Sequence, residues 1–304
     1  MSTAYQRPER LDEALALLDE HGFDAKVLAG GQSLIAMMSA GFLTPELLVD
    51  INHLPGLDHA TVAGGEVRIG ALVRHRTCER AGGELARAAP LLPAAARWIS
   101  HDAVRNRGTM IGAIVHADPS AEWPAVAVAL DARLRLAGSG GEREVPAAEL
   151  FLGPLTVDVE PEEIAVELRF PAAPPRTGVS VRELAHRDGD YAVVGAAAQV
   201  SLDPGGAVAD ARVALFAVDA TPVRVAEAEA LLLGAGPVAD GDRLRPSFEA
   251  AVGEAARAAA AGVNPSTDAT ASAGYRRDMV AVFFARAVRA AAARAEGLKV
   301  PPGA

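Results

Sequence analysis

The chain of 304 residues is long enough for two or three domains with well-developed hydrophobic cores. Half of its residues are apolar and 22% are charged, which is typical of a folded globular protein and excludes general disorder. The formal net charge of −10 argues against a nucleic-acid-binding protein, because such a protein usually carries a basic face.

Cysteine content and hydropathy indicate the cellular compartment of the protein. Cys78 is the single cysteine, so the chain by itself forms neither an internal disulfide nor a Cys-ligated iron–sulfur cluster. The N-terminal stretch has Arg and Glu where a signal peptide needs an apolar run. The most apolar helical stretch, residues 280–293, is interrupted by Arg286 and Arg289. We therefore expect a cytoplasmic protein without a membrane span.

The first 55 residues predict a small α/β unit. Apolar residues recur at helical spacing between Pro8 and Gly22, which favour the start and the end of a helix. A buried strand over 26–29, a helix over 34–40 and a second strand over 47–51 are expected next.

The sequence predicts a second unit over residues 56–174 and a third unit over residues 175–304. The second unit has strands expected at 66–70 and 133–136 and helices at 91–100 and 125–130. The Pro-rich segment 170–175 is the clearest boundary. Beyond it, strands at 191–201 and 211–218 and helices at 222–233, 246–261 and 275–296 predict an α+β domain.

The segment Ala29-Gly30-Gly31-Gln32-Ser33-Leu34 lies between a predicted strand and a predicted helix. Paired glycines let the backbone turn sharply and approach a ligand closely. Ser33 can cap the helix, whose free N–H groups suit an anion such as a pyrophosphate. An ordinary strand–turn–helix junction would have the same spacing, so the segment alone leaves both interpretations open.

A second glycine-containing segment spans residues 105–122. Arginines, a glycine turn and Thr109 in quick succession are suited to another anion-binding loop. Asp118 and Glu122 could accept hydrogen bonds from sugar or ribityl hydroxyls, although a surface loop with a capping Asp fits the pattern equally well. The scattered histidines have no spacing that compels a metal site, and no catalytic side chain can be selected.

Several motifs occur in the order found in the FAD-binding subunits of the molybdenum hydroxylases. They are AGGQSL at 29–34, RNRGT at 105–109, HADPSAEWPAV at 116–126 and YRRDM at 275–279, with LVDIN at 48–52 and GDYA at 189–192 between them. Each motif is weakly specific, but the ordered set covers nearly the whole chain. The chain therefore resembles this family.

The resemblance implies an α+β fold of the vanillyl-alcohol-oxidase or PCMH type, in which two α+β subdomains bind FAD and a C-terminal α+β domain follows. It also implies an FAD-dependent oxidoreductase component in a heteromeric complex. An iron–sulfur subunit would relay electrons from a molybdopterin subunit, and FAD would pass them to an acceptor. The protein would position FAD and tune its electronics, so no catalytic side chain is expected.

The resemblance assigns cofactor contacts to both glycine segments and to four later side chains. The expected FAD-binding residues are Leu28, Ala29, Gly30, Gly31, Gln32, Ser33, Leu34, Thr109, Gly112, Ala113, Asp118, Glu122, Arg182 and Tyr191. The assignments of Arg182 and Tyr191 depend on a looser alignment.

The second loop departs from the usual family pattern of Thr-Ile-Gly-Gly followed by Ser or Asn. Ile111 stands where a glycine is usual, and a β-branched residue is costly where φ is positive or a ligand approaches the backbone. Ala113 lacks a side-chain donor. Two alternatives therefore stay open, namely a stand-alone FAD-dependent oxidoreductase and a flavin-free scaffold or ligand-binding module.

Overall fold

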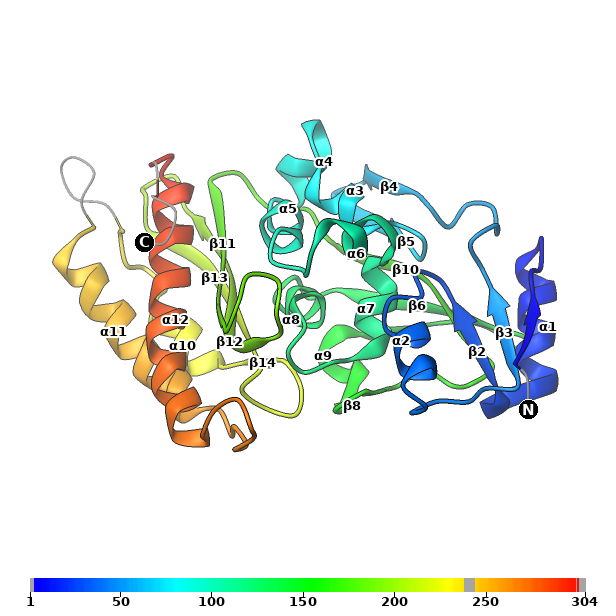
Figure 1. The fold of residues 1–304 in the computed structure, drawn as a ribbon. Helices are drawn as coiled ribbons and strands as arrows, with labels where there is room; N and C mark the ends of the chain where they lie inside the picture. Colours follow the sequence, from blue (N-terminus) through cyan, green and yellow to red (C-terminus); the bar gives the residue numbers. More distant parts are fainter. Residues whose placement is uncertain (1–2, 238–243, 299, 301–304) are drawn as a thin grey trace.

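The computed structural model describes residues 3–237, 244–298 and 300, so the last residues of the predicted third domain lie outside it. Three larger sheets follow one another along the molecule from the N-terminal to the C-terminal side (Figure 1), and a fourth sheet has two short strands. The mixed helix and strand content and the arrangement confirm the predicted α+β class.

The N-terminal unit is a three-stranded parallel sheet with the strand order β1-β3-β2. Its elements are β1 (Ala4–Gln6), α1 (Leu11–His21), the 3-10 helix η1 (Gly22–Asp24), β2 (Ala25–Leu28), α2 (Leu34–Ser39) and β3 (Leu47–Asp50). All four residues of the central strand β3 are buried. Helix α1 ends where Gly22 adopts a φ of +50°, as the sequence predicts.

The middle unit is a five-stranded antiparallel sheet with the order β4-β5-β10-β6-β7. The strands are β4 (Ala60–Ala63), β5 (Glu66–Gly70), β6 (Arg133–Gly138), β7 (Gly141–Pro146) and β10 (Ile164–Pro171), with a separate pair β8 (Phe151–Gly153) and β9 (Thr156–Val157). The helices are α3 (His75–Glu79), α4 (Gly83–Ala88), α5 (Leu91–Ala96), α6 (Asp102–Arg107), α7 (Met110–His116), α8 (Glu122–Ala129) and α9 (Ala147–Leu150).

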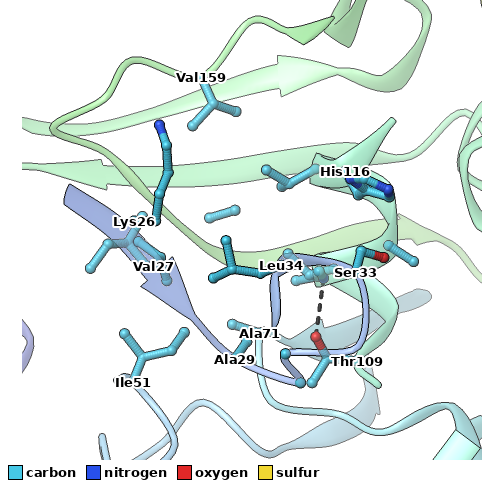
Figure 2. Close-up of a pocket in the computed structure, with 18 of the residues that line it drawn as sticks. Lys26, Val27, Ala29, Ser33, Leu34, Ile51, Ala71, Thr109, His116 and Val159 are labelled. Atoms are coloured by element: carbon cyan, nitrogen blue, oxygen red, sulfur yellow. Dashed lines mark hydrogen bonds between the residues drawn. The ribbon is translucent and has the colours of Figure 1, made fainter. Parts of the chain in front are cut away.

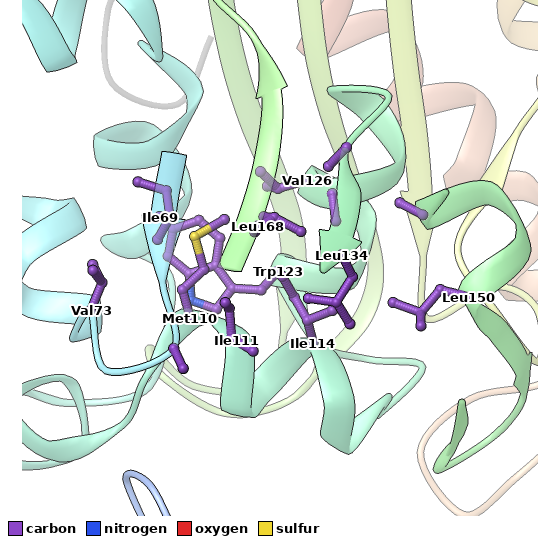
Figure 3. Packing of buried hydrophobic residues seen from close by; sticks show 14 of the residues in the cluster. Ile69, Val73, Met110, Ile111, Ile114, Trp123, Val126, Leu134, Leu150 and Leu168 are labelled. Carbon is purple, nitrogen blue, oxygen red and sulfur yellow. The ribbon is translucent and has the colours of Figure 1, made fainter. Parts of the chain in front are cut away.

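The core of the middle unit lies between this sheet and helices α7 and α8. Trp123, Met110 and Ile114 are almost completely buried and pack against Ile69 and Leu168 of the sheet (Figure 3). Helix α7 is therefore anchored on its apolar side, which fixes the backbone of the second glycine segment.

The C-terminal unit is a four-stranded antiparallel sheet covered by long helices (Figure 1). The strands are β11 (Thr177–Ala185), β12 (Ala192–Leu202), β13 (Val208–Phe216) and β14 (Val223–Arg224), and the helices are α10 (Ala226–Ala230), α11 (Pro246–Ala261) and α12 (Ala273–Ala295). A Cβ on Gly178 would lie 2.0 Å from the carbonyl oxygen of Ala291, so glycine permits the close approach of α12 to β11.

Part of the C-terminal unit differs from the sequence prediction. The helix expected over 222–233 is wrong in its first part, because Val223 and Arg224 pair with β13 as strand β14. Arg224 then binds Glu229 at 2.8 Å, and this ion pair connects the short strand to α10. No helix among the described residues is long and apolar enough to cross a membrane.

Candidate functional site

The two glycine segments meet in direct backbone contact. The first loop, residues 29–33, connects β2 to α2, and the second, residues 107–109, connects α6 to α7. A Cβ on Gly30 would lie 2.7 Å from the carbonyl oxygen of Arg107 and 2.7 Å from the Cα of Gly108. Only glycine fits at position 30, because any side chain would push the loops apart.

The first loop presents unpaired backbone donors. Gly31 has a φ of +71°, a conformation that favours glycine. Within the described part of the chain, the backbone N–H groups of Gly30, Gly31, Gln32 and Ser33 donate no hydrogen bond to the protein. The expected capping role of Ser33 is wrong, because its side chain makes no cap hydrogen bond to α2. Four adjacent donors are thus available to an anion or other acceptor.

The second loop is closed by a side-chain cap. Thr109, which is 2% exposed, accepts a hydrogen bond from the N–H of Gly112 at 3.1 Å and caps α7. A Cβ on Gly112 would lie 2.6 Å from the Thr109 hydroxyl oxygen, so glycine is needed for this cap. The predicted loop over 105–122 thus contains the end of α6, the whole of α7 and a defined turn between them.

Ile111 does not impose the backbone cost that the family pattern suggests. It lies in the first turn of α7, is not among the residues with positive φ, and is 2% exposed. Its side chain packs in the core with Met110 and Ile114 (Figure 3). A β-branched residue is therefore accommodated here without a strained φ. Because Ile111 also borders the 490 Å³ cavity described next, its effect on a bound ligand stays a prediction.

A cavity of about 490 Å³ lies beside the joined loops, between the N-terminal and middle units. Ala29 and Ser33 border it from the first loop, and Thr109 and Ala113 from the second. Figure 2 shows Lys26 of β2 and His116 of α7 on different sides of this space, with Leu34 between them. A second cavity of about 540 Å³ borders residues 28–32 and includes Asp50 and Asn52, so the first loop separates two spaces.

A polar network supports both loops and was missed by the sequence analysis. The Asn52 side chain donates to the carbonyl oxygen of Ala29 at 2.8 Å, and Arg74 donates to the Asn52 oxygen at 2.6 Å. Arg74 also donates to the carbonyl oxygen of Arg107. Arg74 therefore binds the carbonyl of Arg107 directly and connects to the carbonyl of Ala29 through Asn52. Asn52 lies in the LVDIN segment, but the sequence does not indicate that Arg74 is its hydrogen-bond partner.

A buried histidine fixes the second loop from its other side. The indole N–H of Trp123 donates to Nδ1 of His75 at 2.9 Å. Burial lowers the pKa of His75 to about 4, and Arg74 and Arg105 add to this, so the imidazole is neutral. The backbone N–H of His75 donates to the carbonyl oxygen of Gly108 at 3.0 Å. His75 thus holds the loop through its backbone N–H, while its neutral ring accepts the hydrogen bond from Trp123.

The remaining predicted contacts gather at the junction with the C-terminal unit. Burial raises the pKa of Glu122 to about 7, and Asp118 adds to this rise. Burial raises the pKa of Tyr191, and the charges of Asp118 and Glu122 add to this rise. The Tyr191 hydroxyl therefore lies near these two carboxylates. Burial and Glu122 raise the pKa of Glu183, which sequence analysis did not select. None of these four side chains lines the 490 Å³ cavity, and Arg182 borders a different cleft.

Comparisons with known proteins agree with this arrangement. Residues 1–173 match the family described as the FAD binding domain in molybdopterin dehydrogenase, and residues 180–291 match the CO dehydrogenase flavoprotein C-terminal domain. The chain belongs to this FAD-binding family. It is an oxidoreductase component whose cofactor is FAD, and the resemblance found in the sequence motifs is confirmed.

Relatives of this FAD subunit match over almost their full length. The chain is 38% identical to the carbon monoxide dehydrogenase medium chain of Hydrogenophaga pseudoflava, covering 95% of the chain and 97% of the relative. It is 36% identical to subunit alpha of the 6-hydroxypseudooxynicotine dehydrogenase complex of Paenarthrobacter nicotinovorans, covering 97% and 96%. Among solved structures, quinoline 2-oxidoreductase from Pseudomonas putida 86 superposes with a TM-score of 0.88 at 32% identity, covering 97% of this chain and 98% of that one.

The residues present fit the family's cofactor. FAD carries a pyrophosphate, and the first loop offers four unpaired N–H groups at a glycine that lacks room for a Cβ. The adjoining cavity has apolar walls for ring systems, including Val27, Leu34 and Val159. The FAD subunit therefore has donors and apolar walls in one place.

Proposed function

We propose that this chain holds FAD across its two glycine loops and serves as the electron-transfer subunit of a heteromeric molybdenum hydroxylase. The observation that carries the proposal is the junction at Gly30, where four unpaired N–H groups lie beside a cavity between two units. Such a junction is suited to a dinucleotide, whose phosphates need donors and whose rings need apolar walls.

The first loop would bind the pyrophosphate through its backbone, and Thr109, Gly112 and Ala113 would border the cofactor on the other side. Leu28, Ala29 and Leu34 would pack against it. Bound FAD would supply a centre that accepts and releases electrons. No acidic or basic side chain is needed as a catalyst, and this chain's contribution is to position the cofactor and exclude water.

Asp118, Glu122 and Tyr191 would meet hydroxyl groups of the cofactor or the edge of its ring system. A carboxyl with a pKa near 7 can either donate or accept a hydrogen bond at neutral pH, which suits Glu122 to a hydroxyl partner. Arg182 faces the arginines of α12 and borders a separate cleft. Its contact with FAD stays a prediction.

The partners follow from the single cysteine of this chain and from the names of its relatives. Several relatives are named as medium chains or as subunits of complexes. A single buried cysteine, Cys78, cannot ligate an iron–sulfur cluster, so the iron–sulfur and molybdopterin centres would belong to other chains.

Isolation of the tagged chain from cells that make it would test the proposal. We expect FAD, iron, acid-labile sulfide and molybdenum to elute together with two further subunits. Elution of a yellow, FAD-loaded chain alone, without iron or molybdenum, would favour the stand-alone oxidoreductase. A colourless chain that does not bind added FAD would contradict both enzyme hypotheses.

A further inference from the structure

A second large cleft lies between the middle and C-terminal units. Its volume is about 1180 Å³, and it is bordered by the α5–α6 region on one side and by strand β11 and the following turn on the other. It shares no lining residue with the 490 Å³ cavity beside the glycine loops. The two spaces therefore have different walls, although Arg182, for which a contact with FAD is predicted, borders this cleft.

The cleft is positively charged in a strongly acidic protein. Five arginines and three acidic residues are among its described lining residues, whereas the whole chain has a net charge of −10. Arg105 is neutralised by Asp102 and Glu79, which leaves four arginines and two acidic residues among the described lining residues. Burial, together with nearby Glu122, raises the pKa of Glu183 to about 9. Glu183 is therefore uncharged at neutral pH, and positive charge remains.

Three of the arginines approach one another from three different elements. Arg97 follows α5, Arg182 lies on β11 and Arg294 lies on α12. Burial lowers the pKa of Arg294 and Arg97 adds to this effect, while burial and then Arg294 lower the pKa of Arg182. Arg97 and Arg294 thus lie close together, and an anion bound between them would offset the repulsion of their charges.

Arg97 and Arg294 have donors to spare. Within the described residues, Arg97 makes no hydrogen bond or ion pair, and Arg294 makes one hydrogen bond, to the carbonyl oxygen of Val179 at 2.7 Å. Each guanidinium group has five N–H donors, so most of these donors are available to a ligand.

The wall beside the arginines is apolar. Trp98 follows Arg97 and is half-buried, and Pro90, Pro93 and Ala94 lie on the same side of the cleft. An indole ring can stack on a planar heterocycle, and guanidinium groups pair with phosphate oxygens. The cleft therefore combines a ring-binding surface with an anion-binding surface.

We propose that this cleft binds a phosphate-bearing nucleotide, with its phosphates at Arg97 and Arg294 and its base against Trp98. Arg97 belongs to the middle unit and Arg294 to the C-terminal unit, so the ligand would connect the two. Binding would then raise the thermal stability of the chain by mass action.

The test uses the FAD-saturated chain in a phosphate-free buffer, so that the nucleotide cannot enter the cofactor cavity. ADP, pyrophosphate and adenosine are titrated separately by calorimetry, and tryptophan fluorescence is recorded in parallel. Trp98 and Trp123 are the two tryptophans, and Trp123 is buried in the core, so Trp98→Phe identifies the source of any fluorescence change.

We expect ADP to bind with quenching that Trp98→Phe removes, and more tightly than either pyrophosphate or adenosine. Arg97→Glu should weaken ADP binding by about tenfold or more, because it replaces a phosphate partner by a repelling charge. Arg257→Glu, an exposed arginine on α11, is the control with the same charge change and should leave binding unchanged. FAD content should be the same in all variants.

Three results would overturn the proposal. One is the absence of ADP binding at millimolar concentration. Another is equal affinity for pyrophosphate and ADP, which would mean that the base contributes nothing and the cleft is a simple anion site. The third is equal ADP affinity in Arg97→Glu and Arg257→Glu. Because FAD content is measured separately, failure here would be distinguishable from failure of the proposed flavin function.

Discussion

Substitution of Gly30 by alanine tests the junction of the two loops. The added Cβ would lie 2.7 Å from two backbone atoms, whereas ordinary contacts begin at 3.4 Å, so the loops must separate by about 0.7 Å. Because the obstructing atoms are backbone, no side chain can rotate away. Overpacking of this kind costs about 1–3 kcal/mol. If this cost falls on the FAD-bound arrangement, it corresponds to roughly 5- to 150-fold weaker FAD binding.

The assay is a titration of apoprotein with FAD, followed by flavin fluorescence, together with thermal unfolding of the apoprotein. Gly140→Ala is the matched control, since its Cβ would meet no atom within 4 Å and its φ is not positive. We expect the control to bind FAD like the wild type. Equal FAD affinity for Gly30→Ala and the wild type would refute the argument that close contact between these loops forms the cofactor site.

Three further substitutions follow from the structure. Arg74→Ala should weaken FAD binding by about ten- to a hundredfold in the same titration, because it removes the charged hydrogen bonds to Arg107 and Asn52 that support the loops. Equal FAD affinity of this variant and the wild type would contradict the prediction. Ile111→Gly should destabilise the chain by about 2–5 kcal/mol in urea unfolding without tightening FAD binding, because Ile111 is a core residue; tighter binding would show that the family's glycine is needed. Glu183→Gln should stabilise the chain by on the order of 1–3 kcal/mol more at pH 8.5 than at pH 5, measured by unfolding at both values.

The sign of the Glu183 prediction follows from its raised pKa. Below about pH 4.5 the carboxyl is protonated in both the folded and the unfolded chain, so burial adds no pH-dependent cost. Between that pH and about 9 the unfolded chain loses the proton first, and stability falls as pH rises. A glutamine cannot ionise and removes this loss. An equal effect of the substitution at pH 5 and pH 8.5 would contradict burial of a neutral carboxyl.

Local patterns in the sequence predicted much of the fold. The helix that ends at Gly22, the strand–loop–helix around residues 29–34 and the helix over 246–261 depend on spacing and turn residues that lie close together in the chain. The pairing of β10 with β5 could not be predicted in this way, because it joins strands about a hundred residues apart. Strand β14 was missed because its two residues form a strand only through β13.

The candidate site was predictable where glycine marks a tight approach and unpredictable where distant side chains meet. Gly30 and Thr109 could be selected from the motifs, but their mutual contact depends on how two units pack. Arg74 and Asn52 gave no signal, since their importance arises from carbonyls contributed by other segments. The family pattern at Ile111 predicts a cost where φ is positive or where a ligand approaches the backbone. The φ of Ile111 is not positive, and the side chain packs in the core while bordering the 490 Å³ cavity, so its effect on FAD binding stays a prediction.

The most direct test of the central claim is the cofactor content of the purified chain. The protein would be denatured, and the released flavin identified by mass and quantified by absorbance against the protein concentration. We predict FAD at about one molecule per chain, with a clear reduction in Gly30→Ala and none in Gly140→Ala. A chain that carries no flavin and does not bind added FAD would contradict the account, as would equal FAD content and affinity in all three proteins.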